Sequence, residues 1–199
     1  MSLSDPLAQR LTAAGLDPAS VEALVRATLD EDLAGGVDVT SAATVPAEQV
    51  STGDFVARAG GVVAGMPVVE AVLEVVTSGS ARFGSAVADG AAVVRGDVLA
   101  TVTAPTRALL TGERTALNLL CHLSGVATLT RQWVDAVAGT GAAVRDTRKT
   151  TPGLRALEKY AVRCGGGVNH RMALSDAALV KDNHVVAAGG VGPAFAAVR

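Results

Sequence analysis

Aromatic residues are scarce in this 199-residue chain. They make up 3% of it, with one tryptophan and one tyrosine. Proteins that bind single-stranded nucleic acid stack bases on aromatic side chains, so this scarcity argues against that class. The isoelectric point of about 5.9 and the net charge of −2 argue equally against a generally basic DNA-binding protein. We therefore expect no nucleic-acid partner.

Cysteines, long apolar runs and targeting signals are also lacking. The two cysteines, Cys121 and Cys164, have no CxxC partner, which argues against a disulfide framework and against a zinc site. No stretch approaches 18 uninterrupted apolar residues, so we predict no membrane-spanning helix and no membrane partner. The start, MSLSDPLAQR, lacks the basic and apolar regions of a signal peptide. We expect a reducing, cytoplasmic location.

The remaining composition is that of a globular protein. Hydrophobic residues account for 49% and charged residues for 18%, and this length suffices for one compact domain or two small ones. Asp17-Pro18 is a typical helix start, and apolar residues at helical spacing predict a helix over 17–30. From about 50 to 104, short β-like runs interrupted by one helix (66–77) predict an α+β domain with a mostly antiparallel sheet.

The pattern changes in the second part of the chain. Residues 105–138 predict one long helix, or two helices joined at Ser124-Gly125. The runs AAVRD (142–146), TPGLRALEKYAVRCG (151–165) and ALVKDNH (178–184) then predict a strand, a helix and a second strand. This order is a βαβ unit, which implies a parallel sheet. One such unit has too few strands for a sheet covered on both faces, so we expect the fold to continue beyond residue 199.

Positive charge is concentrated between residues 145 and 171. This stretch, the basic island, holds seven arginines and lysines against two acids. Arg148 and Lys149 follow the first predicted strand, His170 and Arg171 follow three glycines, and Lys181 lies at the end of the second predicted strand. The carboxyl ends of parallel strands form the ligand crevice of α/β folds, so these cations predict a polyanion site. Arginine suits it because its planar fork binds carboxylate or phosphate oxygens in pairs.

Parts of the basic island also have a purely structural explanation. Arg155, Lys159 and Arg163 lie at four-residue spacing on one helical stripe, as expected for a solvated helix face. One glycine would serve as a helix C-cap, but three at 165–167 indicate that another group approaches the backbone closely, which favours a functional role. His122 is expected on a helix face and not as a ligand. The P-loop and GxGxxG patterns are absent, so a mononucleotide kinase or dinucleotide dehydrogenase has no support.

Three long motifs carry a resemblance to a known enzyme family. ERTALNLLCHLSG (113–125), RDTRKTTPGLRALEKYAVRCGGGVNHR (145–171) and ALVKDNH (178–184) occur in this order. Together they resemble the quinolinate phosphoribosyltransferases, the carboxylating nicotinate-nucleotide pyrophosphorylases of NAD biosynthesis. The upstream segments LDEDLAGGVDVTSAATVP (29–46) and ARAGGVVAG (57–65) are similar to the family's N-terminal domain.

The resemblance implies a fold and a reaction. The implied fold is α/β: an N-terminal α/β sandwich domain (1–112), followed by connector helices and the first βαβ portion of an incomplete α/β barrel (113–199). The implied reaction joins quinolinate to 5-phosphoribosyl-1-diphosphate in the presence of Mg²⁺ and gives nicotinate mononucleotide, pyrophosphate and CO₂. Both substrates are polyanions, which explains a cationic pocket in a mildly acidic protein.

The resemblance also implies roles for individual residues. Arg148, His170 and Arg171 would bind the quinolinate carboxylates. Lys149 and Lys181 would serve both carboxylates and phosphates and act as the catalytic lysines. The pyridine nitrogen of quinolinate is itself the nucleophile, so the implied work of the protein is positioning and charge compensation.

Two further features of the family concern residues outside this pocket. An arginine at the position of Arg114 would reach into the neighbouring subunit's site, which implies a homodimer or a higher homo-oligomer. The acidic ligands of magnesium would lie beyond residue 199, so no metal ligand is predicted within the chain.

The sequence also has features of two alternative functions. The run ADGAAVVRGDVLATVTAP (88–105) resembles biotinyl and lipoyl carrier domains, but a carrier needs a lysine at a hairpin tip, and the three lysines of the chain lie far downstream. A paralogous phosphoribosyltransferase-like protein of a molybdate-transport system would share the scaffold. Every cation assigned to quinolinate is present, which favours quinolinate as the substrate.

Overall fold

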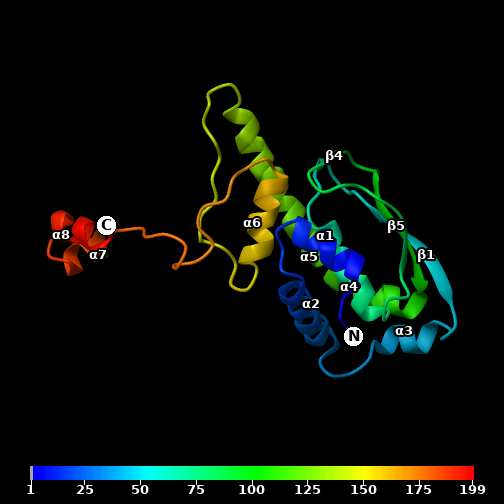
Figure 1. The fold of residues 1–199 in the computed structure, drawn as a ribbon. Coiled ribbons are helices and arrows are strands. Elements are labelled where there is room, and N and C mark those ends of the chain that lie inside the picture. Colours follow the sequence, from blue (N-terminus) through cyan, green and yellow to red (C-terminus); the bar gives the residue numbers. More distant parts are fainter. Residues whose placement is uncertain (1) are drawn as a thin grey trace.

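The computed structural model describes residues 2–199 and confirms an α/β fold with open sheets (Figure 1). Its main body comprises two small sheets and the helices α1 to α6. The helices are α1 (Asp5–Ala13), α2 (Pro18–Leu33), α3 (Val39–Thr44), α4 (Met66–Val76), α5 (Thr106–Ala136), α6 (Arg155–Cys164), α7 (Asp182–Ala187) and α8 (Val191–Ala197). The strands are β1 (Val50–Val56), β2 (Gly61–Val62), β3 (Arg82–Ala86), β4 (Ala92–Val93) and β5 (Val98–Pro105).

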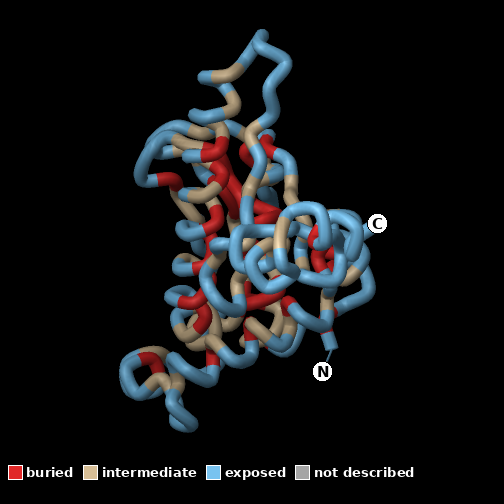
Figure 2. The backbone as a smooth tube through the Cα atoms, turned by 90° about the vertical axis from the view of Figure 1, so that its left-hand side faces the viewer, coloured by how far each residue is buried: buried red, intermediate tan, exposed pale blue. Residues whose placement is uncertain are grey.

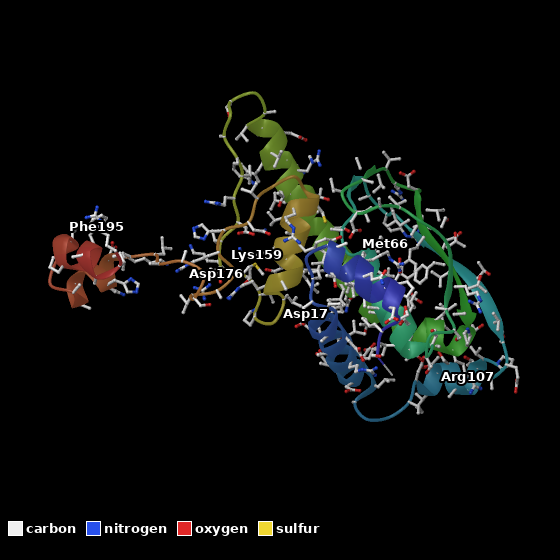
Figure 3. All side chains as sticks on the ribbon, in the orientation of Figure 1. Asp17, Met66, Arg107, Lys159, Asp176 and Phe195 are labelled. Atoms are coloured by element: carbon white, nitrogen blue, oxygen red, sulfur yellow. The ribbon has the colours of Figure 1, made fainter. Side chains whose placement is uncertain are left out.

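The last two helices stand apart from the main body. α7 has no buried residue and α8 has one, Ala194, and the chain that leads to them is exposed (Figure 2). Figure 3 shows Phe195 on this small helical pair, well away from α6. A helix pair with so little buried apolar surface contributes little to the stability of the fold.

The N-terminal elements follow the sequence closely. Asp17 caps α2 by accepting a hydrogen bond from the backbone N–H of Ser20 (3.0 Å), and Pro18 occupies the first turn. Between residues 50 and 105, β1, β5 and β3 form an antiparallel sheet with β5 in the centre, and β2 pairs antiparallel with β4. The predicted antiparallel sheet is therefore confirmed.

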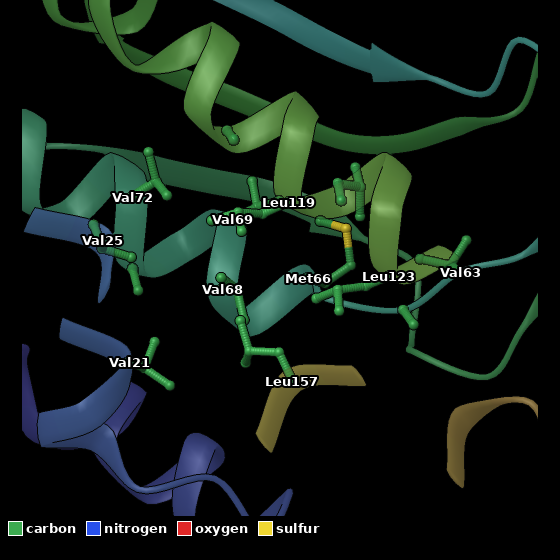
Figure 4. Close-up of a cluster of buried hydrophobic side chains, with 14 of the residues drawn as sticks. Val21, Val25, Val63, Met66, Val68, Val69, Val72, Leu119, Leu123 and Leu157 are labelled. Carbon is green, nitrogen blue, oxygen red and sulfur yellow. The ribbon is translucent and has the colours of Figure 1, made fainter. Parts of the chain in front are cut away.

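The hydrophobic core forms where α4 packs against α2 and α5 (Figure 4). Val68, Val69 and Val72 of α4 are completely buried, together with Val25 of α2 and Leu123 of α5. Burial of each such side chain is worth about 1.5–3 kcal/mol. This packing fixes the position of α5, and α6, which lies within the basic island, packs against α5.

The region 105–138 forms a single helix, α5, which decides between the two predicted alternatives. Gly125 does not interrupt it. The predicted limit between domains at residues 112 and 113 lies inside this helix, and that division remains a prediction. Among residues 2–199, none of the helices combines the length and the hydrophobicity needed to cross a membrane.

The prediction of a second strand over residues 178–184 is wrong. Residues 178–181 form no strand, and α7 begins at Asp182. The first predicted strand, 142–146, is also wrong: only Arg145 pairs, in a single parallel bridge with Val168 after α6, so the predicted βαβ unit and its parallel sheet do not form among residues 2–199. A strand persists only where a neighbour satisfies its backbone groups, and no strand within the described residues lies beside 178–181.

Candidate active site

A buried carboxylate, that of Asp146, organises the basic island. Its Oδ1 accepts hydrogen bonds from Lys159 Nζ (2.5 Å) and from the His170 backbone N–H (2.7 Å), while Oδ2 accepts one from Asn169 Nδ2 (2.6 Å). Lys159 Nζ also donates to the His170 carbonyl (2.8 Å). We call these four residues the Asp146 network. It joins the segment before α6 to the turn after α6.

The prediction that Lys159 lies on a solvated helix face is wrong. Its side chain is 1% exposed and forms an ion pair with Asp146, which is 7% exposed. The four-residue spacing does place Arg155, Lys159 and Arg163 on one stripe, but chain segments on either side of α6 cover that stripe at Lys159. Helical periodicity identifies residues that share a face, and only the tertiary structure decides what covers the face.

The three glycines after α6 allow close packing of α6 on α5. A Cβ atom on Gly165 would lie 2.4 Å from the Ala127 carbonyl oxygen, and one on Gly167 would lie 2.9 Å from the Thr130 methyl carbon. Gly166 has a φ of +90°, which glycine adopts without the strain that a side chain would add. The predicted close approach is therefore to the chain's own helix for Gly165 and Gly167, and a functional role for the three glycines stays a prediction.

Arg148 and Lys149 follow directly after the Asp146 network. Neither forms an ion pair with a carboxylate among residues 2–199. Arg148 Nε is buried yet has no hydrogen-bond partner in that part of the chain. Leaving a buried donor unsatisfied costs about 1–3 kcal/mol, so an acceptor supplied by a ligand would be stabilised here. Lys149 is exposed, and its backbone N–H donates to Thr147 Oγ1 (3.0 Å).

A backbone hydrogen bond holds the His170 ring in one orientation and favours one tautomer of the neutral ring. Its ring Nδ1 accepts a hydrogen bond from the Arg171 backbone N–H (2.8 Å). A ring nitrogen that accepts carries no proton, so the neutral ring carries its proton on Nε2. His170 can therefore donate a hydrogen bond from Nε2 to an anionic ligand.

The carboxylate of Asp176 lies within the influence of both Arg148 and Arg171. The backbone N–H groups of Ala173 and Met172 hold the pKa of the Asp176 carboxyl below 3.8, and the positive charges of the two arginines lower it further. The carboxyl group that both positive charges influence is the chain's own Asp176.

Lys181 and Arg114 do not lie beside the basic island in this structure. Lys181 is exposed and precedes α7, which stands apart from the main body. Arg114 is exposed on α5 and lines a cavity of about 730 Å³. Every residue that lines this cavity lies between 51 and 128, so the basic island has no part in it. The roles assigned to Lys181 and Arg114 remain predictions.

Sequence reasoning missed the acidic members of the site. Glu158 Oε2 accepts the Thr151 backbone N–H (3.1 Å), and Oε1 lies 2.9 Å from His122 Nε2. His122 is on a helix face, as predicted, and 40% exposed. The scarcity of acids in the basic island could have identified them from the sequence. The island contains only Asp146 and Glu158, and both anchor the loop that carries Arg148 and Lys149.

Two models of one protein family match the chain. Residues 38–124 match the N-terminal domain of quinolinate phosphoribosyl transferase, and residues 126–199 match its C-terminal domain. The chain belongs to the quinolinate phosphoribosyl transferase family. The resemblance carried by the sequence motifs is thereby confirmed, and neither the carrier alternative nor the molybdate-transport alternative gains support.

Relatives in this family share long stretches with the chain. The carboxylating nicotinate-nucleotide pyrophosphorylase of Mycobacterium leprae is 58% identical over 88% of this chain and 62% of its own length. A probable nicotinate-nucleotide pyrophosphorylase of Synechocystis sp. is 48% identical over 73% of this chain and 49% of its own length. The crystal structure of NadC from Streptococcus pyogenes matches with a TM-score of 0.87 at 40% identity, covering 92% of this chain and 65% of that one. The chain thus spans between about half and two thirds of these relatives.

Proposed function

We propose that the protein transfers a phosphoribosyl group from 5-phosphoribosyl-1-diphosphate to quinolinate and releases pyrophosphate and CO₂. The observation that carries the proposal is the buried Nε of Arg148, which has no hydrogen-bond partner among residues 2–199. Neither Arg148 nor Arg171 forms an ion pair with a carboxylate in that part of the chain, and His170, next to Arg171, can donate from Nε2. Quinolinate, with two adjacent carboxylates, has the charge and shape for these donors.

The proposed reaction requires no proton transfer by a protein side chain. The pyridine nitrogen attacks the anomeric carbon of the ribose as the bond from that carbon to the pyrophosphate oxygen breaks. The nitrogen, now cationic, stabilises the electron pair left on the adjacent ring carbon when CO₂ departs, and that carbon takes a proton from water. The cations hold the dianion in place and offset the charge growing on the leaving group.

Lys149 and Lys181 are the proposed catalytic lysines. Lys149 is exposed beside Arg148, where it can reach a diphosphate next to the bound quinolinate. The role of Lys181 requires Lys181 to lie closer to α6 than it does in this structure. Nicotinate mononucleotide is the expected product.

Mg²⁺ and a cytoplasmic location belong to the same proposal. Within residues 2–199, no group of three His, Cys, Asp or Glu side chains is arranged to hold a metal ion. These residues do not form a magnesium site by themselves, and none of them is assigned to the ion. Cys121 and Cys164 are both free thiols, which fits a reducing compartment such as the cytoplasm.

Titration calorimetry with quinolinate tests the pocket. Arg148→Ala and Arg171→Ala should each weaken binding about 10- to 100-fold, because each removes a charge-assisted hydrogen bond. Arg95→Ala is the matched control, since Arg95 is an exposed arginine in the turn between β4 and β5. Unchanged quinolinate affinity in Arg148→Ala would refute the pocket.

The active unit in this proposal is a homodimer in which Arg114 serves the partner's pocket. Its support is that Arg114 lines a cavity separate from the basic island of its own chain. Arg114→Ala and Arg171→Ala proteins should each be nearly inactive in phosphoribosyl transfer. After subunit exchange, about half the dimers are mixed, and each holds one site with both arginines, so activity should rise to about a quarter of wild type. A mixture that exchanges subunits but stays inactive would place Arg114 in its own chain's site.

A further inference from the structure

Lys159 and Asp146 place two opposite charges in a position from which water is excluded. Their side chains are 1% and 7% exposed. Desolvation of a buried ion pair offsets most of its Coulombic attraction, and apolar residues of similar size are often as stabilising or more so. Fold stability alone therefore does not account for a charged pair at this position. The explanation must lie in the groups that the two charged side chains contact.

Both charges act on the backbone of a single residue, His170. Asp146 Oδ1 accepts the His170 N–H (2.7 Å), and Lys159 Nζ donates to the His170 carbonyl (2.8 Å). Asn169 Nδ2 bonds Asp146 Oδ2 (2.6 Å) and the Lys159 carbonyl (2.8 Å), which stops the carboxylate from rotating. The backbone of His170 is thus clamped at its donor and at its acceptor.

The clamp ties together the backbone segments on the two sides of the proposed pocket. The His170 ring accepts the Arg171 backbone N–H, so fixing the His170 backbone orients the imidazole and the start of the Arg171 side chain together. Asp146 lies two residues before Arg148. One carboxylate therefore sets the separation between the Arg148 side and the Arg171 side.

We propose that Lys159 and Asp146 are positioning residues that hold His170 and Arg171 at a fixed separation from Arg148, matched to an aromatic 1,2-dicarboxylate. This inference rests on the proposed function, because quinolinate is the dicarboxylate of that reaction. Neither residue contacts the ligand itself. A pocket held in place before binding loses less conformational entropy when the ligand binds, so loosening the clamp lowers affinity without removing any ligand contact.

Two variants separate positioning from stability. Lys159→Met keeps the length of the side chain but leaves the Asp146 carboxylate buried without its ion partner, so it should lower both stability and affinity. Asp146→Asn combined with Lys159→Met removes both charges and should recover much of the stability. The clamp on the His170 carbonyl stays broken in both, so affinity should remain low in both.

Affinity is measured by titration calorimetry with quinolinate and with phthalate, which has the same adjacent carboxylates but no ring nitrogen. We expect binding of both to weaken about 10- to 100-fold in Lys159→Met and in the double variant. Without ligand, hydrogen exchange of the His170 amide should be at least roughly tenfold faster in Lys159→Met. Arg155→Met is the control, because Arg155 lies one turn earlier on α6 and contacts Thr150 and Met172 but not His170.

The outcomes distinguish this inference from the proposed function. Wild-type protein that binds neither dicarboxylate would overturn the proposed function, and the positioning role with it. Wild-type binding with unchanged affinity in Lys159→Met would overturn the positioning role alone. Recovery of affinity together with stability in the double variant, or an equal loss in Arg155→Met, would also overturn it. If Lys159→Met does not fold, the double variant carries the same test.

Discussion

Replacing Gly165 with alanine adds one methyl group at the contact between α6 and α5. The new Cβ atom would lie 2.4 Å from the Ala127 carbonyl oxygen and 2.6 Å from Thr130 Cβ, where ordinary contact begins at 3.4 Å. The first atom belongs to the α5 backbone and the second is bonded directly to it, so neither can rotate away. The end of α6 must therefore move by about 1 Å.

The expected loss of stability combines two opposing effects. Overpacking of this kind costs about 1–3 kcal/mol, and the rigid neighbours place Gly165→Ala at the upper end. The φ of Gly165 is −74°, which alanine adopts readily, so reduced freedom of the unfolded chain returns about 0.4–1 kcal/mol. We expect a net loss of about 2 kcal/mol in the free energy of unfolding.

Urea unfolding followed by circular dichroism measures this loss. Gly125→Ala is the matched control, because Gly125 lies inside α5 with open space where a Cβ atom would stand. It should gain about 0.5–1 kcal/mol from the higher helix propensity of alanine. Equal stability of Gly165→Ala and wild type would refute the close packing of α6 on α5.

Two further predictions concern residues of α6. The buried Tyr160 hydroxyl donates a hydrogen bond to Asp89, and the Asp89 carboxylate also caps α4. Tyr160→Phe should therefore lower the free energy of unfolding, measured with urea, by about 1.5–3 kcal/mol. An unchanged free energy of unfolding would show that this hydrogen bond contributes nothing. Burial raises the pKa of the Glu158 carboxyl, but hydrogen bonds from Thr151 and His122 lower it more, to a net value below 4.5. The stabilisation from the Glu158 carboxylate should be present above pH 4.5 and disappear as the pH falls through the lowered pKa. Thermal unfolding of wild type should therefore lose more stability between about pH 5 and pH 3 than that of Glu158→Gln, and parallel losses would refute the effect.

Local elements were predictable because their causes lie close together in the chain. Asp17-Pro18 predicts the start of α2 through a hydrogen bond that spans three residues. The strands between 50 and 105 follow from short apolar runs between turns. The motifs over 113–184 indicated the family directly, and the identity of the cations at 148, 149, 170 and 171 was readable without any structure.

The tertiary structure decided which of these residues stand together. Lys159 is buried because the Asp146 and His170 backbone regions cover its face of α6, and helical spacing carries no information about a covering segment. Residues 178–181 have strand-like composition but no neighbouring strand, so composition alone could not make them a strand. The sequence by itself determined the family, the inventory of cations and the elements whose causes are local. Only the fold decided that Asp146, Lys159, Asn169 and His170 form one hydrogen-bond network, because hydrogen bonds and charges act over a few ångströms between residues apart along the chain.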